Sequence, residues 1–156
     1  SPRGSQGWLV PGHASEVAGG KRPRLTPAPS MVLRDGRAFM AFGTPGGDVQ
    51  QQAMLQVLLN VTAFGMRPQQ AIEAPRLATR SFPDSFWPHT NSPGRLDVEA
   101  RIAPDTRAAL AQLGHVINDW PDYDWRAGAV CASVVGPNGT RLGGADPRRG
   151  AHSIGW

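Results

Sequence analysis

The stretch AFGTPGGDVQQQAMLQVLLN, residues Ala41 to Asn60, decides how the chain folds around it. The apolar run from Arg37 to Phe42 has the length of a strand, and the glycine-rich segment from Gly43 to Gly47 interrupts it. From Val49 onward apolar residues recur every four positions, which is a helical spacing. Gly65 stands where such a helix would end in a left-handed cap. The stretch therefore predicts a strand, a tight turn and a helix in succession.

The adjacent glycines Gly46 and Gly47 allow two interpretations. In the first they only let the backbone turn tightly, because glycine tolerates positive φ. In the second their N–H groups face an anion at the start of the helix, either a phosphate or the oxyanion of an acyl-transfer intermediate. A phosphate loop fits poorly, because no Gly-Lys-Ser/Thr sequence follows and Asp48 would repel phosphate. The residues alone leave the plain turn and the anion site as alternatives.

The chain has 156 residues, enough for one domain with a hydrophobic core and too few to expect two. We expect residues 1–156 to form a single domain in which 1–19 are an extended loop. The basic residues are scattered, and apart from Lys21 all are arginine, with a formal net charge of +4. A nucleic-acid partner would need a concentrated basic patch, so we expect none.

The single cysteine, Cys131, excludes an internal disulfide, and its apolar neighbours predict a buried, inert thiol. No two histidines have the spacing of a helical metal pair, so we expect no metal and no cofactor. No apolar run reaches the length that spans a membrane.

The rest of the chain predicts short helices and strands separated by turns. Asp35-Gly36 between two apolar runs predicts a hairpin with a type I′ turn. Pro68 and Pro104 stand where proline suits the first turn of a helix. The further expected elements are helices 68–74 and 104–113, strands 76–80, 96–102 and 115–117, and a hairpin of 127–135 with 140–142. Strands and helices come in blocks, which favours the α+β class.

The residues alone assemble no set of nucleophile, base and orienting group. Asp119, Asp122 and Asp124 could gather a cation, but their spacing fits no calcium loop, and a solvated acidic loop is the alternative. The segment from Asp146 to Arg149 could bind a carboxylate through bidentate arginine, or it could be a surface turn.

Short motifs follow one another in order from Gly20 to the C-terminus. They are Gly20-Lys21-Arg22-Pro23, Pro29 to Leu33, Asp35-Gly36, Gly43 to Gly47, Leu55 to Asn60, Phe64 to Met66, Ala71 to Arg76, Leu113 to His115 and Gly144 to Arg148. In this order they resemble the small subunit of the γ-glutamyltransferases, a branch of the N-terminal nucleophile hydrolases.

The resemblance implies an αββα sandwich in which helices cover two antiparallel sheets. It also implies a longer precursor that cuts itself into a large and a small subunit, with a new N-terminal threonine as nucleophile and its amino group as base. That threonine attacks a γ-glutamyl amide such as glutathione and passes the acyl group to water or an amino acid. The family's oxyanion-hole glycines correspond to Gly46 and Gly47, which favours the anion site over the plain turn.

Two positions depart from the pattern of the family. Paired serines that hold the substrate's α-carboxylate are replaced by Leu25 and Thr26, and the usual Ser-Arg after the glycines is replaced from Asp48 onward. The resemblance still places Leu25, Thr26 and Asp48 at the substrate pocket. The alternatives are an acylase or amidase of other specificity, or a non-catalytic binding domain that keeps the fold.

The family's nucleophile lies several dozen residues before the segment that begins at Gly20, and only 19 residues precede Gly20 here. Ser1 stands at the wrong spacing for that role, and Pro2 follows it. We therefore expect the C-terminal part of a small subunit, without its nucleophile and without the first strands of the sandwich. Its partners would be the remainder of its precursor and a γ-glutamyl small molecule, and alone it would be inactive.

Overall fold

The computed structural model describes residues 6–22 and 24–155. Ser1 and Pro23, which entered the sequence argument, lie outside the described residues. The strands of the first sheet, in spatial order, are β1 (Ser30–Arg34), β2 (Arg37–Gly43), β6 (Cys131–Val135) and β7 (Arg141–Gly144). The strands of the second sheet are β3 (Leu77–Thr79), β4 (Arg95–Glu99) and β5 (Val116–Trp120).

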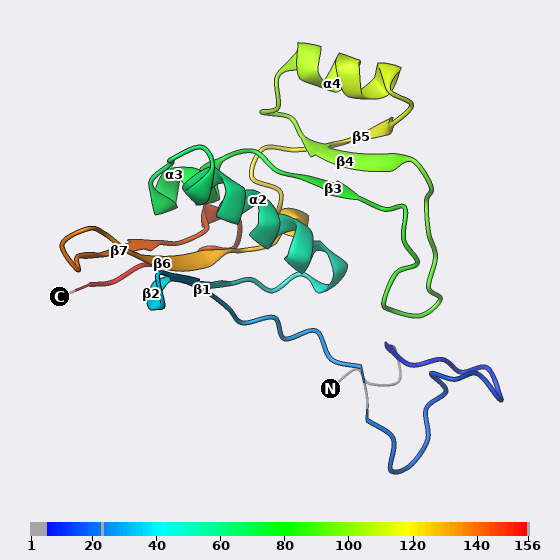
Figure 1. Ribbon diagram of the computed structural model, residues 1–156. Helices are drawn as coiled ribbons and strands as arrows, with labels where there is room; N and C mark the ends of the chain where they lie inside the picture. The colour runs from blue at the N-terminus through cyan, green and yellow to red at the C-terminus, as the bar shows by residue number, and fades with distance from the viewer. Residues whose placement is uncertain (1–5, 23, 156) are drawn as a thin grey trace.

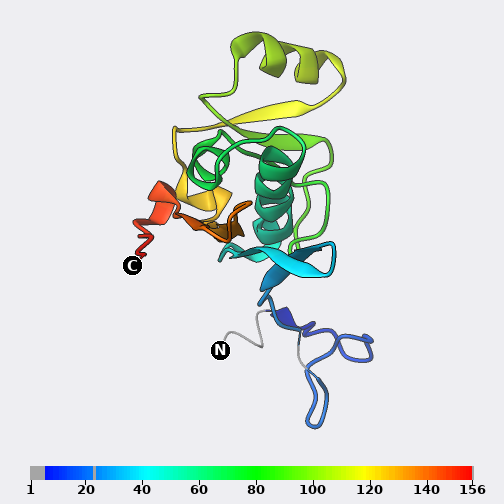
Figure 2. The same ribbon diagram turned by 60° about the vertical axis from the view of Figure 1, so that its left-hand side comes forward.

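The helices are α2 (Gln50–Thr62), α3 (Pro68–Glu73) and α4 (Pro104–Gln112), and the 3-10 turns are η1 (Gly47–Val49), η2 (Trp125–Ala127) and η3 (Pro147–Arg149). Helices α2 and α3 lie along one face of the four-stranded sheet, and the three-stranded sheet lies beyond α2 (Figures 1 and 2). Helix α4 covers the outer side of that second sheet (Figures 1 and 2). The mixed architecture agrees with the α+β expectation.

The expected pairing was wrong in the second sheet. The first sheet is antiparallel throughout, and β3 pairs antiparallel with β4. Strands β4 and β5, however, run parallel, so the second sheet is mixed. The physical reason is the connection: α4 leads from β4 to β5 as a crossover helix, and such a crossover joins parallel strands.

Local turn chemistry is as the sequence predicts. Asp35 and Gly36 both have positive φ, 51° and 74°, as a type I′ turn requires, and they join β1 to β2. Gly65, at φ 66°, lies just beyond the end of α2 in the left-handed region. Most expected elements lie within a few residues of their observed bounds, including α4, which ends at Gln112 rather than 113.

The core lies between the four-stranded sheet and helices α2 and α3. Its largest buried apolar side chains are Met40, Val57, Ile72, Val130 and Trp120. The expectation of a buried Cys131 was wrong, because its side chain is exposed. Side chains alternate between the faces of a strand, and in β6 the core face belongs to Ala132 and Val134.

Two glutamine side chains of α2 form hydrogen bonds with the backbone of β3, in the pattern that a neighbouring strand would form. The side-chain amide of Gln56 donates to Leu77 O at 2.9 Å and accepts from Leu77 N at 3.0 Å. Gln52 makes the same pair of contacts with Thr79, at 3.3 and 2.8 Å. Strand β3 is an edge strand, so these amides occupy the edge that a further strand would otherwise pair with.

Replacing Gln56 by alanine should lower the free energy of unfolding by about 1–3 kcal/mol. The reason is that the half-buried N–H and C=O of Leu77 would lose their partners at once. The measurement is urea unfolding, with Gln51→Ala as the control, because Gln51 is an exposed glutamine of the same helix. Equal losses in the two variants would show that the Gln56 contacts do not stabilise this edge.

Candidate functional site

The two glycines form a corner between β2 and α2. Gly46 has φ 141° and Gly47 has φ 59°, backbone conformations that residues other than glycine rarely adopt. The carbonyl of Gly46 accepts from Val49 N at 3.2 Å, which closes the turn η1. Within residues 6–22 and 24–155 the N–H groups of Gly46 and Gly47 have no protein acceptor. The corner therefore leaves two adjacent backbone N–H groups without a protein acceptor in this part of the chain, which an oxyanion hole requires.

The segment that precedes β6 packs against this corner. The hydroxyl of Thr44 accepts from Ala129 N at 2.7 Å and donates to Pro45 O at 2.7 Å. A Cβ on Gly128 would lie 2.9 Å from the Thr44 hydroxyl, so only glycine fits against it. The segment before β6 thus fixes the backbone from which the two donors project.

The carboxylate of Asp48 accepts hydrogen bonds from within the chain. One carboxylate oxygen accepts from Ser85 N at 2.6 Å and the other accepts from the Ser85 hydroxyl, which is buried. This clasp holds the 81–94 loop over the corner, where Phe86 lies 3.1 Å from the position of a Cβ on Gly47. Arg24 approaches the same carboxylate at 3.9 Å from the exposed N-terminal side. Asp48 therefore positions a loop, in addition to lying beside the two donors.

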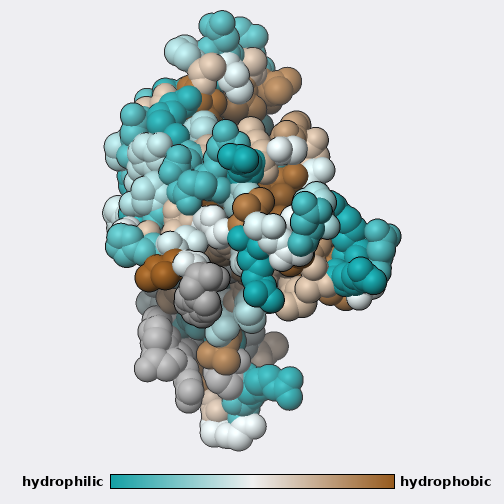
Figure 3. Space-filling view, turned by 90° about the vertical axis from the view of Figure 1, so that its left-hand side faces the viewer, coloured by the Kyte–Doolittle hydropathy of each residue, from teal (hydrophilic) through white to brown (hydrophobic). Residues whose placement is uncertain are grey.

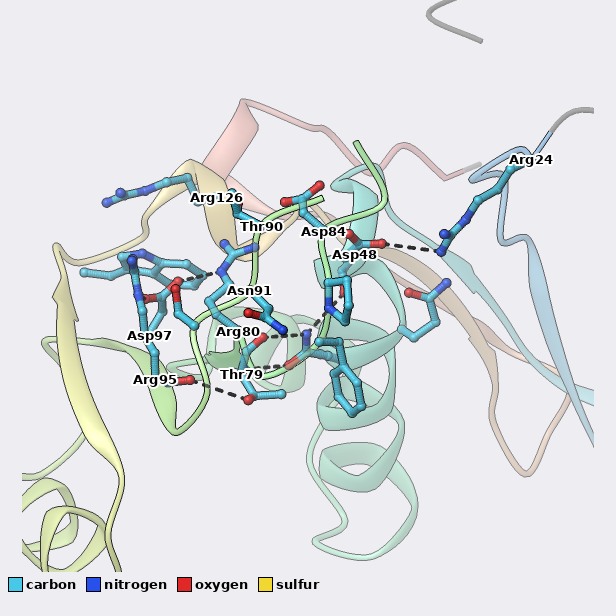
Figure 4. A pocket seen from close by; sticks show the side chains of 16 residues that line it. Arg24, Asp48, Thr79, Arg80, Asp84, Thr90, Asn91, Arg95, Asp97 and Arg126 are labelled. Carbon is cyan, nitrogen blue, oxygen red and sulfur yellow. Dashed lines mark hydrogen bonds and ion pairs between the residues drawn. The ribbon is translucent and has the colours of Figure 1, made fainter. Parts of the chain in front are cut away.

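A cavity of about 740 Å³ opens beside Asp48. Its walls come from the start of α2, the ends of β3 to β5, η2 and the 81–94 loop. Figure 4 shows Arg80, Arg95 and Asp97 on one side of this cavity and Asp48 and Arg24 on the other. A small polar molecule could therefore contact charged groups of both signs next to the glycine corner.

Asp97 organises the charged side of the cavity. Its side chain is buried and accepts from Arg80 Nε at 2.8 Å, Arg95 Nε at 2.7 Å and Asn118 Nδ2 at 2.9 Å. The sequence pattern did not predict this cluster. Residue 97 lies in the strand expected at 96–102, but residue 95 lies just outside it, and only the observed strand β4 shows that the two share a face. The contact of Arg80 with this cluster could not be predicted, because the local sequence pattern does not indicate that β3 pairs with β4.

Arg126 lies at the rim of this cavity and pairs with Asp124, its distances being 2.9 Å from Nε to Oδ1 and 2.5 Å from Nη2 to Oδ2. The solvated acidic loop expected around Asp124 was wrong at this residue, because its side chain is buried. The hydrogen bond from Arg126 outweighs burial and lowers the pKa of Asp124 below its ordinary value. Asp124 therefore stays ionised and neutralises Arg126.

In the segment from Asp146 to Arg149, the side chains of Asp146 and Arg148 are buried and bind groups of the chain itself. Arg148 is buried and binds the carboxylate of Glu99 through two bonds, 2.7 Å from Nε and 2.6 Å from Nη2. Asp146, also buried, forms an ion pair with Arg76 Nη1 at 2.7 Å and accepts from Arg148 Nη1 at 3.1 Å. The bidentate arginine of the sequence hypothesis is therefore real, but its carboxylate belongs to the chain itself.

The pKa values of the two buried arginines shift in opposite directions. For Arg76, desolvation is the largest influence, and with the nearby charge of Arg148 it lowers the pKa. For Arg148, desolvation also acts downward, but the hydrogen bonds and charge of Glu99 together with Asp146 offset it and raise the pKa. The cluster ties α3, β4 and the C-terminal segment together, so its role is structural.

The other residues expected at the site lie apart from the cavity. Leu25 is 59% exposed and Thr26 is half-buried, and neither lines the cavity beside Asp48. Among the described residues no group of three or more His, Cys, Asp or Glu side chains could hold a metal ion. No helix in the described part of the chain is long and apolar enough to cross a membrane. Figure 3 shows a mostly hydrophilic face on which hydrophobic residues occur in small groups.

Comparison with known proteins identifies the family. The gamma-glutamyltranspeptidase family model matches residues 1–156. The glutathione hydrolase-like YwrD proenzyme of Bacillus subtilis is 33% identical over 154 residues, covering 98% of this chain and 28% of that protein. The oxamate amidohydrolase proenzyme of Klebsiella pneumoniae is 33% identical over 156 residues, covering 99% of this chain and 28% of that protein.

A solved structure shares the fold. The cephalosporin acylase of Bacillus halodurans superposes with a TM-score of 0.78 at 31% identity, covering 94% of this chain and 25% of that chain. The chain thus spans about a quarter of the length of these relatives, all of which are enzymes by name and two of which are proenzymes. On this evidence the chain belongs to the gamma-glutamyltranspeptidase family of N-terminal nucleophile hydrolases.

Proposed function

We propose that this chain is the C-terminal part of the small subunit of an enzyme that cleaves γ-glutamyl amides, glutathione among them, through an acyl-enzyme. The remainder of its precursor would supply the large subunit, the first strands of the αββα sandwich and the nucleophilic threonine. On this proposal the nucleophile would not come from the residues of this chain. The observation that carries the proposal is the glycine corner, with two backbone donors that have no protein acceptor among the described residues.

The geometry suggests what the chain would do during the reaction. When the threonine attacks the amide carbonyl, its oxygen becomes negatively charged, and the N–H groups of Gly46 and Gly47 would donate to it. The donors would need no rearrangement, because Gly128 and the Thr44 hydroxyl already hold the turn. Collapse of the intermediate releases the amine and leaves the acyl group on the threonine, from which water or an amino acid then takes it.

The substrate pocket would lie beside Asp48, in the cavity that follows the corner. Thr26 and Leu25 would reach it from the extended segment before β1, once the rest of the precursor is in place. A second candidate is an acylase or amidase of other specificity. It is favoured by Asp48, whose two oxygens are already engaged by Ser85 rather than free for a substrate.

The chain expressed alone should not release p-nitroaniline from γ-glutamyl-p-nitroanilide. Oxyanion donors stabilise a charge that only a nucleophile can create, and on this proposal the nucleophile would belong to the remainder of the precursor. The full-length, self-cleaved protein, assayed in parallel, should turn the compound over. Steady release by the purified 156-residue chain would show that a residue within it is the nucleophile.

A further inference from the structure

One cluster in the cavity carries a positive charge that its own carboxylate does not neutralise. Arg80 and Arg95 both donate through Nε to the one carboxylate of Asp97. Two guanidinium groups on one carboxylate leave one positive charge in excess. Arg126 adds nothing to it, since Asp124 already takes both of its contacts.

The two guanidinium groups are held in place but remain accessible. Asp97 is 1% exposed and fixes both Nε atoms, whereas the side chains of Arg80 and Arg95 are 29% and 38% exposed. In the described part of the chain, the Nη groups of both arginines make no hydrogen bond to a protein acceptor. Trp120 lies beneath, its ring centroid 5.8 Å from the Arg80 guanidinium carbon. Prepositioned guanidinium donors of this kind match a planar carboxylate.

We propose that Arg80 and Arg95 form a binding site for a carboxylate carried by the substrate, with Asp97 as the residue that positions both arginines. The choice of ligand rests on the proposed amide cleavage, because the cavity begins at Asp48, next to the oxyanion donors. Within the described residues, the acids on the opposite wall, Asp48 and Asp84, form no ion pair with Arg80 or Arg95. Asp48 accepts from Ser85, and Asp84 accepts from Phe86 N at 2.8 Å.

The kinetic test uses matched substrates on the self-cleaved, full-length enzyme. Glutaryl-p-nitroanilide carries a carboxylate on the acyl side, and pentanoyl-p-nitroanilide has a methyl group in its place. On the amine side, pentanoyl-4-aminobenzoate is compared with pentanoyl anilide. In at least one pair, Arg80→Gln and Arg95→Gln should each reduce the preference for the carboxylate compound by roughly ten- to a hundredfold.

For each variant, kcat/KM is measured for both substrates of a pair in one preparation. Partial unfolding lowers both values by the same factor and therefore cancels from their ratio. Arg107→Gln is the control, because Arg107 pairs with Asp119 on the far side of the second sheet, outside the cavity. Its preference should equal that of the unchanged enzyme. Unchanged preference in both pairs for both cavity variants would overturn the site.

A binding measurement separates this site from the proposed function. Glutarate should raise the melting temperature of the unchanged protein and of Arg107→Gln, and should not raise that of Arg95→Gln. If this pattern appears in a protein that cleaves no amide, the carboxylate site stands and the proposed function falls. If the protein cleaves γ-glutamyl amides but glutarate acts equally on all three, the function stands and the site falls.

Discussion

Replacing Gly47 by valine in the self-cleaved enzyme should lower kcat by roughly a hundred- to a thousandfold, the usual loss of about 2.7–4 kcal/mol for one oxyanion donor. The side chain cannot keep the present backbone, because φ is 59° and a Cβ would meet the Phe86 ring at 3.1 Å. The peptide must therefore turn, and its N–H would leave the position from which it donates. The measurement is kcat for γ-glutamyl-p-nitroanilide, with self-cleavage checked first.

Strain alone also destabilises the protein, so a matched glycine is needed. Gly65 has φ 66°, close to that of Gly47, and nothing lies within 4 Å of the position of its Cβ. Gly65→Val should lower the melting temperature through the same backbone strain while leaving kcat near normal. A near-normal kcat in folded, self-cleaved Gly47→Val enzyme would reduce the glycine corner to a plain turn.

Replacing Glu99 by alanine should cost about 3–5 kcal/mol of stability, the typical result of removing one partner of a buried ion pair. Arg148 would lose both of its bonds to this carboxylate in a site where neither side chain is exposed to solvent. The backbone N–H groups of Arg76 and Asp124 would lose the same acceptor. Equilibrium unfolding in urea measures the loss.

The control is the exposed pair of Arg107 and Asp119, in which the Asp119 side chain is 68% exposed. Asp119→Ala should change stability by at most about 1 kcal/mol, because solvent screens such a pair. A Glu99→Ala protein no less stable than Asp119→Ala would mean that the buried cluster does not hold α3, β4 and the C-terminal segment together.

The predictable parts of the fold follow from rules that act within a few residues. Asp35-Gly36 requires a type I′ turn, Pro104 begins a helix, and Gly65 caps one, whatever the rest of the chain does. The family resemblance led to the correct family, and from it came the hypothesis that Gly46 and Gly47 stabilise an oxyanion. The parallel pairing of β4 with β5 escaped prediction because it depends on where α4 packs, far from either strand's own pattern.

The wall of the candidate site depends on contacts between distant segments. Ser85 reaches Asp48 across 37 positions, and Gln52 reaches Thr79 across 27. Arg80 meets Asp97 only because β3 lies beside β4. No periodicity marks such pairs, so the sequence predicted the corner of the site but not the loop and the arginines around it.

The most direct test of the oxyanion role is a crystal structure of the self-cleaved, full-length enzyme with a tetrahedral adduct on its nucleophile. A boronate or phosphonate analogue of a γ-glutamyl amide would place an oxygen where the oxyanion forms. The account predicts that this oxygen lies about 2.7–3.1 Å from the backbone nitrogens of Gly46 and Gly47. An adduct oxygen bound by other donors, with both of these nitrogens beyond hydrogen-bonding distance of it, would contradict the account.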